Sequence, residues 1–156
     1  MKLKPLMLLL AASTTVAGVL YLNRGPKTEY HFARIAGVHP STPGNYKDMA
    51  FVYLLDSLGN KKDSMNVEIT PQVCKEYRIQ YDEYGKQRLP NRLVVAEFEK
   101  GEIKAEGTDS TYTGLIKMTR AAPVANKEDL PLWGERIRKA KLEKRPEYLF
   151  GKAAER

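Results

Sequence analysis

Side chains able to perform catalysis are sparse in this sequence of 156 residues. There are two histidines, His31 in an expected strand and His39 directly before a proline. Acid–base and nucleophilic catalysis need paired groups held within hydrogen-bond reach. Carboxylate pairs such as Glu97/Glu99 occur, but they fall on one face of an expected strand, where water solvates them. We therefore expect structural or surface roles for both histidines and no enzymatic activity.

The only cysteine is Cys74, so the chain forms no internal disulfide and assembles no thiolate metal site. No histidine is near it in sequence, and we expect a small buried side chain of a strand rather than a nucleophile. Gly-rich phosphate loops, G-x-S-x-G and H-E-x-x-H motifs are missing too. The sequence therefore predicts no cofactor and no metal site. An enzyme whose site follows an unrecognised pattern is kept as one alternative.

Positive charge is concentrated at the end of the chain, which has a formal net charge of +7. Residues 24–133 contain 16 Lys and Arg against 15 Asp and Glu, whereas residues 134–156 contain 8 against 4. A nearly neutral body lacks the basic groove that nucleic-acid binding needs. Acidic residues interleaved with the basic ones are typical of a solvated helix face. We therefore expect no nucleic-acid partner.

Residues 5–22 form a run of 18 residues without a charge. A helix of this length spans about 27 Å, close to the ~30 Å hydrocarbon core of a bilayer. The lysines before the run favour a cytoplasmic N-terminus, with the body outside the cytoplasm. The run also fits a signal peptide cleaved after the triplet at 15–17. Because apolar residues resume at 19–22, we favour a retained single-pass signal-anchor at 1–23; a secreted or periplasmic protein is the alternative.

The segment 28–120 has the pattern of short strands separated by turns. Strands are expected at 29–38, 49–55, 65–69, 77–81, 93–98, 103–106 and 112–118. Turns are expected at 58–61, 83–86 and 99–102, and a further hairpin around 107–109. Roughly six or seven strands at this spacing favour a mainly β domain, either a small barrel or a sandwich. Sequence alone does not reveal the order in which they pair.

The basic tail, residues 121–156, carries the signals of one amphipathic helix. Pro131 suits a first helical turn, apolar residues recur at spacings of three and four, and Pro146 ends the pattern. This predicts a helix over 131–145, followed by a short apolar segment at 148–150. Aromatic and basic side chains of this kind are enriched where partner proteins bind. The predicted partner-binding residues are Trp133, Arg136, Ile137, Arg138, Tyr148 and Phe150.

An anchored barrel of this size that is followed by a tail is similar to the haem chaperones of cytochrome maturation. That family attaches haem through a histidine closely followed by a tyrosine near the end of the barrel. Residues 107–156 contain no histidine, so this attachment is not expected in the present chain.

The sequence thus predicts a non-catalytic accessory or assembly subunit. It would be held in a membrane by residues 5–22 and would bind a partner protein through its β domain and its basic C-terminal helix. The alternative is a freely secreted β domain that binds a ligand or a protein after signal cleavage.

Overall fold

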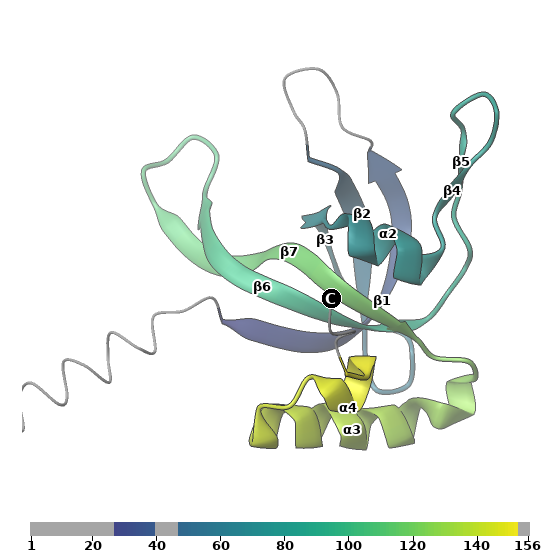
Figure 1. Ribbon diagram of the computed structural model, residues 1–156. Helices are drawn as coiled ribbons and strands as arrows, with labels where there is room; N and C mark the ends of the chain where they lie inside the picture. The colour runs from purple at the N-terminus through teal and green to yellow at the C-terminus, as the bar shows by residue number, and fades with distance from the viewer. Residues whose placement is uncertain (1–26, 40–46, 153–156) are drawn as a thin grey trace, which may run out of the picture.

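The computed structural model describes residues 27–39 and 47–152 (Figure 1). The hydrophobic run at 5–22, predicted as an N-terminal helix, and most of the proline-rich loop after β1 lie outside these ranges. Within the described ranges, no helix is long and apolar enough to cross a bilayer.

Five strands form a closed barrel, which confirms the prediction of a mainly β domain. The barrel strands are β1 (Thr28–His39), β2 (Met49–Leu55), β3 (Lys61–Ile69), β6 (Val94–Lys104) and β7 (Thr111–Pro123). They follow one another around the barrel in the order β1-β2-β3-β7-β6, and β6 pairs with β1 to close it. Every pairing is antiparallel except the short parallel contact of β3 with β7. This is the connectivity of the OB-fold, a five-stranded Greek-key barrel.

Alternation along the strands separates the inside of the barrel from its outside. In β2, Ala50, Val52 and Leu54 are buried, whereas the residues between them are half-buried. Because successive side chains of a strand point to opposite faces, Phe51 and Tyr53 share the outer face. The inner residues join one apolar core with Val67, Val94, Phe98 and Met118.

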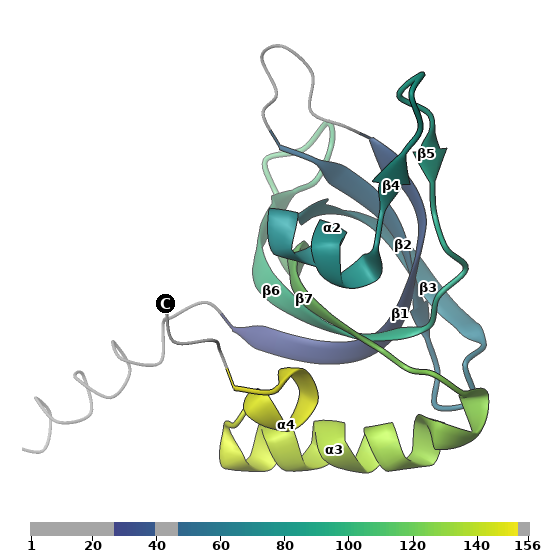
Figure 2. The ribbon, with the colours of Figure 1, turned by 45° about the vertical axis from the view of Figure 1, so that its right-hand side comes forward.

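Residues 71–77 form a helix, although Cys74 and Tyr77 were predicted to lie in strands. Cys74 and Tyr77 belong to α2 (Pro71–Tyr77), so their assignment to strands is wrong. The Thr70 hydroxyl accepts a hydrogen bond from Val73 N at 3.3 Å, and a proline occupies the first turn. The helix ends at Arg78 in the left-handed conformation. Figure 2 shows α2 lying across the opening of the barrel. Tyr77 of this helix is fully buried and belongs to the apolar core.

Two short strands, β4 (Gln80–Tyr81) and β5 (Gln87–Arg88), follow α2 and form a hairpin of their own outside the barrel. The turn between them, with Gly85 at φ 75°, is the one that the sequence predicts at 83–86. The described part of the chain contains seven strands, but only five form the barrel, so the predicted barrel or sandwich of six or seven strands is wrong in size. The strands predicted at 93–98 and 103–106 are one strand, β6.

The turn predicted at 99–102 is wrong, because β6 runs through it without interruption to Lys104. Gly101 lies directly opposite Gly114 of β7, so both glycines belong to an extended pair. The chain reverses only at 105–110, which agrees with the hairpin predicted around 107–109. The β6–β7 pair consequently extends beyond the barrel as a two-stranded projection, which we call the arm (Figure 1).

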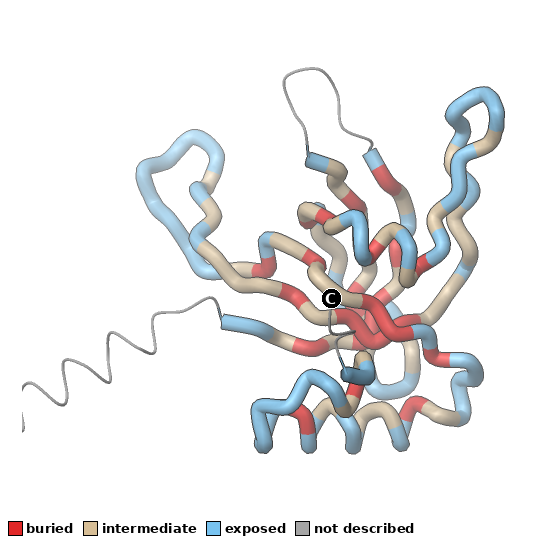
Figure 3. Tube along the Cα trace, viewed as in Figure 1, coloured by how far each residue is buried: buried red, intermediate tan, exposed pale blue. Residues whose placement is uncertain are grey.

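The C-terminal helix is present and packs on the outside of the barrel. After the short η1 (Lys127–Asp129), α3 (Leu130–Glu143) is followed by α4 (Glu147–Phe150), which the sequence did not predict as a helix. Leu130, Ala140 and Leu149 are buried there against Tyr30 and Phe32 of β1. Figure 3 shows that burial is concentrated where the strands cross, while the arm and the outer side of α3 remain exposed.

Candidate functional site

The predicted partner-binding residues of the tail fall into two groups. The apolar group, Trp133, Ile137, Tyr148 and Phe150, is partly buried and packs around the cluster that joins the tail to the barrel. Phe150 lies beside Tyr30, with ring centroids 6.2 Å apart. These residues therefore contact their own barrel, and their remaining exposed surface is the part available to a partner.

The basic group lies on the outer side of α3, over the aromatic residues. The guanidinium carbon of Arg136 is 4.8 Å from the centroid of the Trp133 ring, and Lys139 Nζ is 4.9 Å from that of Tyr148. Arg138 donates hydrogen bonds to the carboxylate of Glu135, three residues before it, and this holds the pKa of Glu135 below its usual range. Cations stacked on aromatic rings are held in place while their charge still faces water.

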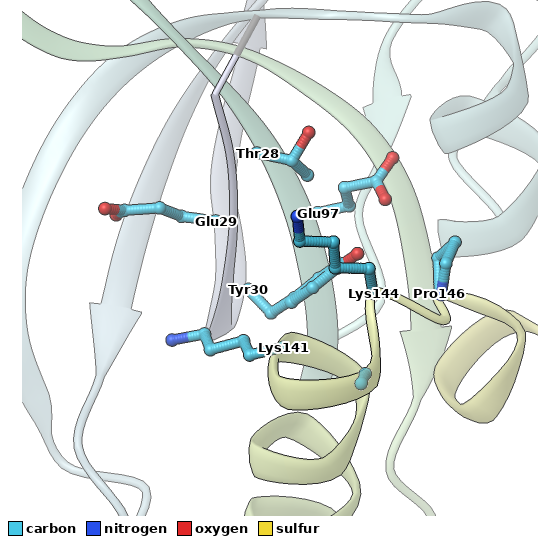
Figure 4. A pocket seen from close by; sticks show the side chains of 8 residues that line it. Thr28, Glu29, Tyr30, Glu97, Lys141, Lys144 and Pro146 are labelled. Carbon is cyan, nitrogen blue, oxygen red and sulfur yellow. The ribbon is translucent and has the colours of Figure 1, made fainter. Parts of the chain in front are cut away.

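A cleft of about 620 Å³ separates the end of α3 from β1 and β6 (Figure 4). Lys141 and Lys144 line it from the helix side, and Tyr30 and Glu97 line it from the barrel side. Burial raises the pKa of the Tyr30 phenol, and the nearby Glu97 carboxylate raises it further. Because charges of both signs line the cleft, it does not form a site selective for an anion or a cation.

Both histidines belong to β1. His31 is partly buried in β1, where Nε2 lies 2.9 Å from Glu29 Oε2 and the ring packs edge-on against Phe98. Lys100 Nζ donates to the other oxygen of Glu29 at 2.6 Å, and this hydrogen bond is the main cause of the lowered pKa of Glu29. His39 is the exposed last residue of β1. Among the described residues, no group of three acidic, histidine or cysteine side chains could hold a metal ion.

The outer face of β1, β2 and β3 carries a cluster that sequence reasoning missed. Tyr53 of β2 packs edge-on against Phe51, with ring centroids 5.5 Å apart. The guanidinium carbon of Arg34 lies 5.3 Å from the centroid of the Tyr53 ring, and Lys61 Nζ lies 4.5 Å from it. We call these four residues, Arg34, Phe51, Tyr53 and Lys61, the aromatic face.

Alternation in 49–55 places Phe51 and Tyr53 on one side, and this much was readable from the sequence. The cations come from two other strands. Arg34 is the partner of Tyr53 in the β1–β2 register, and Lys61 comes from the start of β3. Those registers depend on strand order and on the bulges in both pairs, which the sequence pattern does not specify.

The aromatic face continues toward the tail. Leu55, the last residue of β2, packs against the cluster under α3. The turn that follows it lies against the start of the tail, where a shallow hollow is lined by residues of both segments, including the 70% exposed Leu58. The outer side of β2 and the first turn of α3 thus belong to one continuous surface.

Comparisons of the chain with protein-family models, with curated protein sequences and with solved structures return no match.

Proposed function

We propose that this protein is a non-catalytic, membrane-tethered accessory or assembly subunit, which binds a partner protein with its aromatic face and the outer side of α3. The proposal rests chiefly on one observation, the Tyr53 ring held between Arg34 and Lys61 on the outside of the barrel.

The composition of this surface is that of a binding site. Tyrosine and arginine are enriched among the residues that contribute most to protein–protein affinity. Tyr53 and Phe51 are only half-buried in the free protein, so a partner would remove further apolar area from water. Their contacts with each other and with the two cations already restrict the side chains, which lowers the entropy lost on binding.

The charge of the surface indicates the chemistry of the partner. Arg34 and Lys61 on the barrel, and Arg136 and Lys139 on α3, each place a positive charge over an aromatic ring. Complementary potentials steer association and suppress wrong partners. We therefore expect the partner to present acidic side chains here.

Site-specific cross-linking tests the proposal. A photoreactive benzoylphenylalanine replaces Tyr53 in the full-length chain in its native host, and Tyr84, which is 87% exposed on the β4–β5 turn, serves as the matched control position. We expect a discrete adduct from position 53 that is lost when Lys61→Glu and Arg34→Glu are added, and no such adduct from position 84. Equal labelling from both positions would reject the aromatic face as the contact.

Point variants are preferable to removal of the tail. Without residues 124–152, the apolar side chains of Tyr30, Phe32 and Val95 would lose the cover that α3 and α4 provide. A truncated chain would then fail to bind because of misfolding as readily as because of a lost contact.

A second candidate, a freely secreted binding domain, shares the same surface. It is favoured by the packing of the apolar side of α3 on its own barrel, which a tail reserved for a partner would not need. Intact-mass and N-terminal sequence analysis separates the two. Soluble protein that begins near residue 18 supports secretion, whereas full-length protein in carbonate-washed membranes supports the tether.

A further inference from the structure

The arm has one apolar face that the described part of the chain leaves uncovered. It consists of Gly101 and Ile103 of β6 with Tyr112, Gly114 and Ile116 of β7, and we call it the arm face. Tyr112 is 56% exposed and Ile116 is 38% exposed. Exposed apolar side chains that gather on one side of a strand pair usually mark a contact surface.

The two glycines make this face flat. Gly101 and Gly114 are directly paired, so they share a side of the arm. A Cβ atom added to Gly114 would lie 2.8 Å from Ile103 Cδ1, and one added to Gly101 would collide with Ile116 Cδ1. Both isoleucine side chains therefore lie across glycine backbone of the opposite strand, which forms a low, continuous apolar surface rather than a ridge.

The start of the described chain lies at the base of the arm. Lys100 N donates a hydrogen bond to Lys27 O at 2.8 Å, and Thr28 pairs with Glu99. Only residues 23–26 separate Lys27 from the uncharged run at 5–22. Five chain steps span at most about 18 Å, which is close to the length of the arm beyond Lys100.

We infer that the arm face lies in the interfacial layer of the bilayer that holds residues 5–22. This inference rests on the tether in the proposed function. The tether keeps the base of the arm within about 18 Å of the end of the hydrophobic run. Tyrosine is favoured at the membrane–water interface, where its ring is in an apolar layer and its hydroxyl reaches water.

The charges of the arm identify the kind of lipid contact. Residues 99–117 contain three lysines and four acidic residues, so the arm has no excess of positive charge for anionic headgroups. Its contact is therefore apolar, and it should occur on zwitterionic lipid and persist at high salt.

Depth-dependent quenching in vesicles tests the inference. The full-length chain carries Cys74→Ser and one new cysteine with an environment-sensitive dye, at Tyr112 on the arm face. Control labels are placed at Thr113, its exposed neighbour on the opposite side of the strand, and at Tyr84 on the distant β4–β5 turn. The proteins are reconstituted in phosphatidylcholine vesicles with and without lipids brominated near the headgroup. Since all three sites are exposed, labelling should leave the fold intact, which circular dichroism checks.

The expected result is quenching by brominated lipid that is at least about threefold stronger at position 112 than at positions 113 and 84, and unchanged by salt. If the protein floats with the vesicles and position 112 is quenched no more than position 84, the inference is overturned and the tether stands. If the dye at 112 becomes less exposed without lipid quenching, a second copy of the chain covers the face and the inference is also overturned. If the protein does not float at all, the tether itself fails.

Discussion

Arg120 donates a hydrogen bond from Nε to Glu76 Oε1 at 2.8 Å, which links β7 to α2. The other oxygen of Glu76 accepts a hydrogen bond from Ala121 N at 2.8 Å. The same guanidinium lies over the ring of Phe150, with its central carbon 5.0 Å from the ring centroid. One ion pair therefore connects the helix in the barrel opening, a barrel strand and the last helix of the tail.

We expect Glu76→Ala to lower the free energy of unfolding by about 2 kcal/mol, because it leaves both Arg120 and the Ala121 amide without their acceptor. Glu76→Gln keeps one acceptor oxygen and should cost about half as much. Urea unfolding followed by circular dichroism measures both. Equal stability of Glu76→Ala and the wild type would contradict a structural role for this pair.

The Tyr77 hydroxyl accepts a hydrogen bond from Ile35 N at 3.1 Å and donates one to Arg92 O at 3.0 Å, inside the barrel opening. Tyr77→Phe leaves the Ile35 amide without this acceptor, which should cost about 1–3 kcal/mol. The matched control is Tyr84→Phe on an exposed turn, which should change stability by less than about 0.5 kcal/mol. Thermal unfolding of the two variants distinguishes a specific hydrogen bond from a general effect of losing a phenol.

Gly59 has φ 81° in the turn between β2 and β3. An added Cβ would lie 2.9 Å from Lys127 Cε and 3.3 Å from Leu130 Cδ1. Gly59→Ala should destabilise the protein by about 1–2 kcal/mol, because an L-residue is strained in this conformation. Gly37→Ala is the control, since an added Cβ there meets no atom within 4 Å. Similar melting temperatures for both variants would show that the turn tolerates a side chain.

The pKa of Glu29 is lowered from its ordinary value of 4.5, first by the hydrogen bond from Lys100 and then by that from His31. A carboxyl with a lowered folded-state pKa contributes stability above pH 4.5 and loses it as the pH falls through the folded-state pKa. The wild type should therefore be more stable than Glu29→Gln at pH 7, and this difference should disappear in acid. Because Glu29 is 34% exposed, salt should reduce the difference. A difference that persists at pH 2 would contradict this assignment.

The elements that the sequence predicted correctly are those whose signal is local. The strands at the beginning of the domain, the turn at Gly59 and the amphipathic helix after Pro131 all depend on neighbours within a few residues. Closure into a barrel rather than a sandwich depends on pairing between distant strands, such as β1 with β6, which no local pattern encodes.

Two predictions were wrong because a residue pattern typical of one element occurs here in another. The alternation of residues 77–81 resembled a strand, but the hydroxyl of Thr70 and the proline after it start a helix just before this segment. Gly101 resembled a turn residue, although it gives space to Ile116 from the opposite strand. The aromatic face could not be predicted in full from the sequence, because its two cations come from neighbouring strands whose register the sequence does not specify.

The docking of the tail on β1 affects how the chain is made. Tyr30 and Phe32 are near the beginning of the domain, and the residues that cover them, from Leu130 to Leu149, are among the last to be synthesised. During translation or export, this apolar surface of the first strand therefore stays exposed until almost the whole chain has been synthesised. Incomplete chains expose apolar area that favours aggregation, so biogenesis of this protein should depend on a holding chaperone more strongly than its small size suggests.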